Sequence, residues 1–330
     1  MLTGHTIDYW VIWTCIGRSS FANAVLVNFA GFLTVAVPSI RRVNGPAYLL
    51  ETLASLSEHT SASEKSDVSV VVLLADFDAE YNNETIAAVL KHHRDDVASG
   101  FISIIQVSSS YYPQLKGLKR NFGDAPDRVE WRAKQVADYS FLFMYSADIS
   151  AYYIQLEDDV HSALGFVRSV QQYVDEQNRI HPKWSVLEFS ELGFIGKLFR
   201  SSCLEHLAEF MMMFYVEQPV DWLFRYFKFA MNQQLTFLRK PTVFQHFGIK
   251  SSFDLSKDNA LKDRLVLCNI RSFMANEFLQ LPELLNTFKR IVCIFYQVNI
   301  LFHIEKLRQS SFSYNSVNSC KFQIFYKSTF

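Results

Sequence analysis

A short apolar run, residues 152–156, ends in three consecutive carboxylates: Glu157, Asp158 and Asp159. Hard divalent cations prefer oxygen ligands, and Mg²⁺ or Mn²⁺ is typically held by one or two acids while substrate phosphates complete the shell. Three adjacent acids also repel one another, so a bound cation would stabilise them. The triplet therefore predicts a divalent metal site with a nucleoside diphosphate as its natural partner. A solvated acidic turn is the alternative interpretation.

A second segment joins an apolar run to a glycine-containing loop. Residues 184–189, which include Glu188, form the strand-like part, and Gly193 and Gly196 follow in the loop. Glycine lets the backbone approach a ligand closely, although an ordinary turn uses it as well.

Two further residues carry side chains that are useful in catalysis. Asp221 follows Pro219 at the start of a helix expected at Trp222–Phe229, where an N-cap role is the simpler interpretation. His246 lies in an apolar strand-like segment, where a hydrogen-bonded core histidine is the alternative to a functional one.

The elements that must position these residues alternate between strand and helix. Apolar strand patterns lie at Leu33–Val37, Val68–Leu74, Phe101–Val107 and Ala151–Leu156, and helix patterns lie at Tyr48–Glu58, Glu80–Asp95 and Arg128–Ser146. This alternation predicts an α/β fold with a mostly parallel central sheet flanked by helices.

Polar residues follow three of the predicted strands. Pro38 and Arg41 come after the first, Asp76 and Asp78 after the second, and the acids 157–159 after the fourth. Ligands of such sheets bind beyond the carboxyl ends of the strands. We therefore expect these residues to converge on one crevice.

Composition limits the classes of protein to consider. The 330 residues are 49% hydrophobic and 20% charged, so a sizeable core is expected. The net charge of −1 and the lack of a Lys/Arg run argue against a nucleic-acid binder. The five cysteines show no CxxC spacing and so no zinc signature.

The sequence divides into three parts. Residues 1–30 are expected to be a truncated anchor and stem, or disordered. Residues 21–37 read as a marginal membrane span, but 33–37 fit a buried strand ended by proline better. Residues 31–252 form the predicted catalytic domain. Residues 253–330 hold ten phenylalanines and no glycine, and are interpreted as a divergent extension that is poorly ordered or helical.

Several long motifs resemble the N-acetylglucosaminyltransferase IV family, the mannosyl-glycoprotein 4-β-N-acetylglucosaminyltransferases of N-glycan branching. The resemblance covers about residues 32–252. It is carried by YYIQLEDD (152–159), LEFSELGFIGKLF (187–199), FYVEQPVDWL (214–223) and PTVFQHFGIKSS (241–252), with support from LTVAVPSI (33–40), SYYP (110–113), FGD (122–124) and RVEWRAKQVADY (128–139).

This resemblance implies a GT-A glycosyltransferase fold and a metal-dependent enzyme. The donor would be UDP-N-acetylglucosamine (UDP-GlcNAc) and the metal Mn²⁺ or, less typically, Mg²⁺. The reaction would transfer N-acetylglucosamine with inversion, in β1,4 linkage, to the α1,3-arm mannose of an N-glycan core on a glycoprotein. The family's location, the lumenal side of the Golgi membrane, is the corresponding expectation.

The resemblance also suggests roles for individual residues. Asp159 is the expected direct metal ligand and His246 a second one, with Asp221 as catalytic base and Glu188 in reserve. The donor-binding residues would be Pro38, Arg41, Asp78, Glu157, Asp158, Gly193, Gly196 and one of Arg132 and Lys134. Arg41 and Asp78 would face the nucleoside. Since Arg132 and Lys134 are two apart on one helix, at most one should reach phosphate.

Two other functions remain open at this stage. One is a catalytically incomplete relative that binds UDP-sugar or glycan without transfer, which the unusual tail favours. The other is a metal-dependent phosphohydrolase, which would share the acids but hydrolyse the UDP-sugar.

Overall fold

The apolar segments predicted as strands form the centre of the fold. The computed structural model describes residues 31–42 and 45–253. The expectations for residues 1–30 and 254–330 lie outside the described residues. Within the described part, one sheet has six strands in the order β3-β2-β1-β4-β7-β6, and β5 pairs with β8 in a small second sheet.

The elements have the following bounds. The strands are β1 Gly31–Ser39, β2 Val68–Leu74, β3 Ile102–Gln106, β4 Ser150–Gln155, β5 Val160–Ser162, β6 Leu187–Glu188, β7 Lys197–Arg200 and β8 Phe244–His246. The helices are α2 Leu49–Glu58, α3 Ala79–His92, α4 Arg94–Ala98, α5 Pro126–Ser146, α6 Phe166–Ile180, α7 Leu204–Met213 and α8 Val220–Ala230, with 3₁₀ turns η2 Glu64–Ser66, η3 Ser109–Tyr111 and η4 Ser201–Cys203.

The first four strands are parallel, and their register brings the predicted site residues to one edge. β1 pairs with β2 so that Ser39 lies opposite Leu74, and with β4 so that Ala36 lies opposite Gln155. The carboxyl ends of β1, β2 and β4 therefore meet. β7 and β6 extend the sheet by antiparallel pairing. The predicted α/β class with a mostly parallel sheet is thus confirmed.

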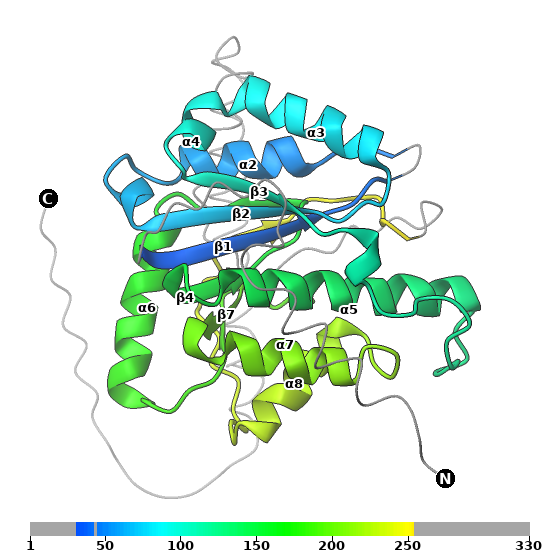
Figure 1. The fold of residues 1–330 in the computed structure, drawn as a ribbon. Coiled ribbons are helices and arrows are strands. Elements are labelled where there is room, and N and C mark those ends of the chain that lie inside the picture. The colour runs from blue at the N-terminus through cyan, green and yellow to red at the C-terminus, as the bar shows by residue number, and fades with distance from the viewer. Residues whose placement is uncertain (1–30, 43–44, 254–330) are drawn as a thin grey trace, which may run out of the picture. The chain divides into compact units, whose positions relative to one another are not determined.

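Helices cover both faces of this sheet (Figure 1). α2, α3 and α4 lie on one side, and α5, α7 and α8 on the other. One apolar cluster joins β1 and β2 to Leu53 of α2 and Val170 of α6. A second joins the opposite sheet face to Val136 of α5, Leu207 of α7 and Phe224 of α8. The sheet is therefore buried on both faces, as its near-continuous apolar strands require.

Some elements differ from the sequence prediction. The expected helix over Glu80–Asp95 is divided into α3 and α4 at His93. α6 and α7 were not predicted, although α6 buries an apolar stripe that includes Phe166, Val170 and Val174. None of the helices within residues 31–42 and 45–253 combines the length and apolar character needed to span a membrane.

Candidate active site and metal centre

The acids after β4 are held by a residue that follows β1. Arg42 Nη1 donates to Asp158 Oδ2 at 3.0 Å and Nη2 donates to Asp158 Oδ1 at 2.7 Å. Arg42 Nη2 also reaches Asp159 Oδ2 at 3.2 Å, and Ser39 Oγ donates to Asp158 Oδ2 at 2.7 Å. Both oxygens of Asp158 are therefore already bonded. Asp158 positions the site through Arg42, while Asp159 keeps an oxygen available.

Arg42 also fixes the segment that follows β8. Its Nε donates to the carbonyl of Lys250 at 3.1 Å, and its guanidinium lies 4.8 Å from the ring centre of Tyr48. The Tyr48 hydroxyl in turn accepts from the backbone N–H of Ile249 at 3.1 Å. Arg42 and Tyr48 together therefore hold residues 249–250 against the acidic turn.

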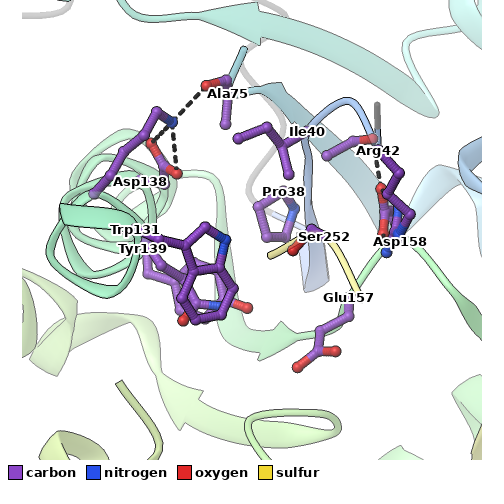
Figure 2. Close-up of a pocket in the computed structure, with 13 residues that line it drawn as sticks. Pro38, Ile40, Arg42, Ala75, Trp131, Asp138, Tyr139, Glu157, Asp158 and Ser252 are labelled. Carbon is purple, nitrogen blue, oxygen red and sulfur yellow. Dashed lines mark hydrogen bonds and ion pairs between the residues drawn. The ribbon is translucent and has the colours of Figure 1, made fainter. Parts of the chain in front are cut away.

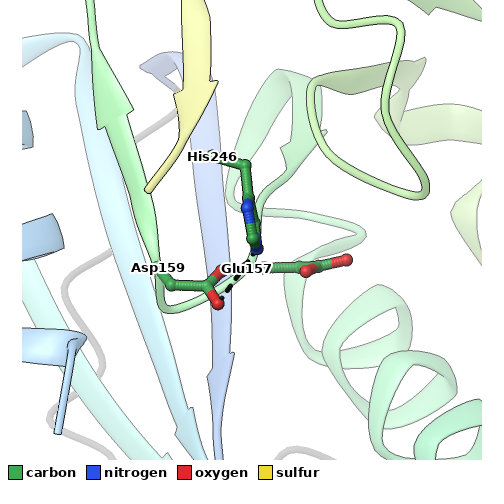
Figure 3. Close-up of side chains that lie close together, drawn as sticks. All are labelled: Glu157, Asp159 and His246. Atoms are coloured by element: carbon green, nitrogen blue, oxygen red, sulfur yellow. Dashed lines mark ion pairs between the residues drawn. The ribbon is translucent and has the colours of Figure 1, made fainter. Parts of the chain in front are cut away.

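Three side chains that can bind a metal converge at this place. Ligand atoms of Glu157, Asp159 and His246 all lie within 4.8 Å of one another. His246 lies between the two acids, as Figure 3 shows, and its Nε2 is 3.2 Å from Asp159 Oδ2. Pairing of β5 with β8 produces this arrangement, because Val160, next to Asp159, lies opposite His246.

The donor set fits a divalent cation. Asp159 Oδ1 is buried and has no hydrogen-bond partner within the described part of the chain. Two carboxylates and an imidazole suit Mn²⁺ and also Mg²⁺, with further oxygens supplied by water or phosphate. The backbone at Gly248 packs directly on Asp159, since a Cβ there would lie 2.1 Å from Asp159 Oδ2. Gly248 thus helps to fix the position of the Asp159 carboxylate.

Burial strongly perturbs the acids. Burial, together with the neighbouring charges of Asp159 and Asp221, raises the pKa of Glu157 to about 8. Burial also raises the pKa of Asp158, against the opposing effect of Arg42. A cation at Glu157 and Asp159 would reverse the repulsion among these carboxylates, because it favours their ionised forms.

A pocket opens beside the acidic turn (Figure 2). The open space within it, which includes the solvent at its mouth, is about 530 Å³. The carboxyl ends of β1 and β2 and one face of α5 line it, through Pro38, Ser39, Ile40, Arg42, Ala75, Trp131, Lys134, Gln135, Asp138 and Tyr139, together with Glu157, Asp158 and Ser252. Pro38, Glu157 and Asp158 therefore meet at one pocket as expected, whereas Arg41, Asp76, Asp78 and Asp159 are not among its lining residues.

Asp221 approaches the acidic turn from another element. It is the second residue of α8, and Pro219 occupies the N-cap position, so Asp221 is not the N-cap residue. Gly193, at φ +33°, lies next to it: a Cβ there would be 3.7 Å from both Asp221 Oδ1 and Glu157 Oε1. Burial raises the pKa of Asp221, although Lys197 and Arg225 oppose the shift.

Glu188 is engaged elsewhere. Its Oε2 lies 3.1 Å from Lys197 Nζ and its Oε1 lies 3.6 Å from Lys228 Nζ. Lys197 is 1% exposed and also donates to the carbonyl of Ser190. Glu188 thus neutralises two buried lysines, which gives it a structural role near Asp221.

The remaining predicted donor-binding residues fall into different environments. Arg41 and Asp78 form an ion pair of 2.9 Å, and Asp78 also caps α3 by accepting from the N–H of Glu80 and Tyr81. Lys134 lines the pocket, where it bonds to Asp138 at 2.9 Å and to the Ala75 carbonyl.

Arg132 and Gly196 do not line this pocket, and neither do Arg41, Asp78 and Gly193. Arg132 is buried beside Asp124, with its Nε 3.3 Å from Asp124 Oδ2. Gly196 packs into the core, because a Cβ there would be 3.1 Å from the Phe244 ring.

Sequence reasoning missed several residues of the site. The sequence points to Arg41 rather than Arg42, because the loop after the strand has no periodic pattern that would distinguish them. Trp131 and Tyr139 line the pocket through α5, and lie with Gln135 on the segment RVEWRAKQVADY that supported the resemblance. Gly248, in the segment PTVFQHFGIKSS, could have been found from its position two residues after His246.

Comparison with known proteins identifies relatives over about two thirds of this chain. An alpha-1,3-mannosyl-glycoprotein 4-beta-N-acetylglucosaminyltransferase C of Danio rerio is 43% identical over 232 residues, which are 70% of this chain and 50% of the relative. An alpha-1,6-mannosyl-glycoprotein 4-beta-N-acetylglucosaminyltransferase of Gallus gallus is 42% identical over 67% of this chain and 47% of the relative. The chain spans about half the length of the curated relatives it matches.

Among solved structures, S. aureus TarS 1-349 in complex with UDP-GlcNAc matches 53% of this chain and 47% of its own, with 14% identity and a TM-score of 0.32. The family model named MGAT4 conserved region matches residues 27–266. That match includes the acidic turn, the glycine loop, Asp221 and His246. The resemblance to the N-acetylglucosaminyltransferase IV family is therefore confirmed, and the chain belongs to the family defined by the MGAT4 conserved region.

Proposed function

We propose that this chain is an inverting glycosyltransferase that moves N-acetylglucosamine from UDP-GlcNAc to the 4-hydroxyl of the α1,3-arm mannose of an N-glycan core. The proposal rests on two groups of side chains that lie close together in this member of the family. A metal-ligand set, Glu157, Asp159 and His246, lies near a further carboxylate, that of the half-buried Asp221, and both Glu157 and Asp221 border Gly193.

Asp221 is the proposed general base. It would accept the proton of the mannose 4-hydroxyl as that oxygen forms a bond to the anomeric carbon and the bond from that carbon to the UDP oxygen breaks. A base with a pKa above that of an ordinary aspartate removes this proton more effectively near neutral pH, and such catalysis typically contributes about 10²–10⁴-fold. Lys197 and Arg225 still favour its ionised form.

Mn²⁺ is the proposed metal, with Mg²⁺ as substitute, and Asp159, His246 and Glu157 would hold it. Bound there, it would supply electrostatic stabilisation for the negative charge that develops on UDP. The chain's own contribution is orientation. Arg42 and Gly248 fix the Asp159 carboxylate from two sides, and Asp158 fixes Arg42.

The nucleotide would occupy the pocket at the ends of β1 and β2. Pro38 and Ile40 offer an apolar surface for the base, and Lys134 and Asp138 offer polar groups on the opposite wall. Arg41 and Asp78 lie near the same strand ends and are proposed to face the nucleoside.

The relatives are named for different mannose arms, so the arm that this chain modifies needs a direct test. The Danio rerio protein is named for the α1,3-mannosyl arm and the Gallus gallus protein for the α1,6-mannosyl arm, at nearly equal identity. We propose the α1,3 arm.

The test is a transfer assay with the purified 330-residue chain, UDP-GlcNAc and two N-glycan acceptors in which only one mannose arm is available. Each is run with Mn²⁺ and with EDTA. Metal-dependent β1,4 addition to the α1,3 arm supports the proposal, and addition to the other arm would correct the acceptor. Saturable UDP binding without product would favour the catalytically incomplete relative, and UDP release without a glycan product would favour hydrolysis.

We also propose a location at the lumenal side of the Golgi membrane, since transfer to glycoprotein N-glycans requires access to secretory cargo. Co-localisation of the tagged chain with a Golgi marker supports this, and a cytosolic distribution would contradict it.

A further inference from the structure

Arg132 on α5 is a buried cation with unused hydrogen-bonding capacity. Its side chain is 2% exposed. Its ion pair with Asp124 involves Nε, and neither Nη1 nor Nη2 has a hydrogen-bond partner among the described residues. Buried polar groups are nearly always hydrogen-bonded, so this guanidinium edge requires an explanation. Burial lowers the pKa of Arg132, and Asp124 only partly opposes this effect.

A single aromatic ring covers this guanidinium. The Arg132 Cζ lies 5.5 Å from the ring centre of Phe122, and Phe122 itself is 66% exposed. The backbone of Phe122 is also in an unfavourable conformation, with φ +59°, which bulky residues rarely adopt. Gly123 follows at φ +70°. Such outliers persist where the surroundings enforce them and often occur at ligand-binding segments.

Arg132 does not itself line the pocket, but its neighbours on α5 do. On a helix, residues separated by three and seven positions share a face, so Arg132 lies on the same face of α5 as Gln135 and Tyr139. Both of those residues line the pocket, and so does Trp131, the residue before Arg132. Arg132 therefore lies beside the α5 residues that line the pocket, with its guanidinium under the ring of Phe122.

Other cations around the pocket are already bonded to the protein. Arg42 is bonded to Asp158 and Asp159. Lys134 is bonded to Asp138 and to the Ala75 carbonyl. A diphosphate that enters this pocket would thus find few N–H donors that are not already in use.

We propose that the Nη1 and Nη2 edge of Arg132 binds phosphate oxygens of the nucleotide donor after the turn Phe122–Asp124 moves aside. A guanidinium presents two parallel N–H groups that match a phosphate in a bidentate arrangement. The identity of the ligand rests on the proposed function. The turn is then a cover that protects the guanidinium in the ligand-free chain.

The test measures the binding of UDP and of uridine to the full chain by calorimetry, with Mn²⁺ present. Arg132→Gln removes the charge and Arg132→Lys keeps it but lacks the bidentate edge. We expect each to weaken UDP binding by about tenfold or more and to leave uridine binding unchanged. Arg128→Gln is the matched control, because Arg128 is on the same helix, four residues earlier, and pairs with the same Asp124 at 3.2 Å.

A second variant tests the cover and does not depend on the stability of the Arg132 variants. Phe122→Gly removes the ring, and glycine adopts a positive φ without strain. If the cover must open before phosphate binds, this variant should lower the Kd for UDP, because a larger fraction of the chain is competent to bind.

Equal UDP affinity in wild type, Arg132→Gln and Phe122→Gly would overturn the inference and leave the proposed function intact. Equal losses for UDP and uridine would also overturn it, since the role would then be structural. Wild-type chain that binds no UDP would overturn the proposed function and the inference with it.

Discussion

Gly248→Ala should damage the metal centre through one added methyl group. In the wild-type structure a Cβ at this position would lie 2.1 Å from Asp159 Oδ2, 2.7 Å from Cγ and 2.9 Å from Cβ. Real Cβ atoms essentially never approach another atom within 3.0 Å. Because the clash involves three successive atoms of Asp159, rotation of the carboxylate alone cannot relieve it.

The size of the effect follows from this distance. Bringing Oδ2 from 2.1 Å to 3.0 Å requires a shift of about 0.9 Å, by the carboxylate or by the backbone of residues 246–250. A misplacement of about 1 Å can reduce turnover by about 10²-fold, and disturbance of groups that orient a metal ligand typically reduces metal affinity by about 10–100-fold. The overpacking itself should cost about 1–3 kcal/mol of stability.

The assay measures the Kd for Mn²⁺ by titration, together with transfer rate and thermal unfolding. Gly165→Ala is the control, because Gly165 has φ +71° with no atom within 4 Å of the added Cβ, so the substitution strains the backbone without crowding Asp159. It should lower Tm and leave the Mn²⁺ affinity unchanged. If Gly248→Ala binds Mn²⁺ and turns over like wild type, the contact between this backbone and Asp159 is absent from the working enzyme.

Three more substitutions test the remaining roles. Asp221→Asn should keep UDP-GlcNAc binding but lose about 10²-fold or more in kcat. In wild type, kcat/KM should fall as the pH drops through the pKa of Asp221, which burial raises above 3.8. If Asp221→Asn shows the same fall of kcat/KM at low pH, Asp221 is not the base. Glu188→Gln should lower Tm, because Lys197 then has one fewer anionic partner. A loss of kcat with an unchanged Tm would instead indicate that Glu188 is catalytic. Arg42→Gln should destabilise the fold by about 3–5 kcal/mol, since it leaves Asp158 buried and uncompensated, and a chemical denaturation midpoint equal to that of wild type would contradict this.

The positions of the acidic residues could be predicted because strand ends obey simple geometry. Once the strands at 33–37, 68–74 and 151–156 are recognised as parallel neighbours, the residues after them must share an edge. The pocket and the metal-ligand set at Glu157 and Asp159 confirm that placement. His246 was found by its motif, but its approach to Asp159 depends on pairing of β5 with β8, which strands of three residues do not reveal.

The side-chain partners could not be predicted in the same way. Arg41 and Arg42 are adjacent in a loop, where no period of 2 or 3.6 decides which one points inward. The structure turns Arg42 to the acids and leaves Arg41 half-exposed beside Asp78. For Glu188, a buried acid in a motif was compatible with a base, and only the positions of Lys197 and Lys228 show that it is engaged in ion pairs.

The bond from Arg42 to the Lys250 carbonyl joins residues separated by 208 positions. During synthesis, β1, β2 and β4 can pair once residue 155 has emerged, and the nucleotide pocket between them can begin to form. His246, Gly248 and Lys250 are made almost a hundred residues later, and the closure entropy of so long a loop must be met before their contacts contribute. The proposed metal site is therefore the last part of this region to assemble on a growing chain. A nascent domain would form the pocket at the strand ends before the segment after β8 docks and brings His246 to Asp159.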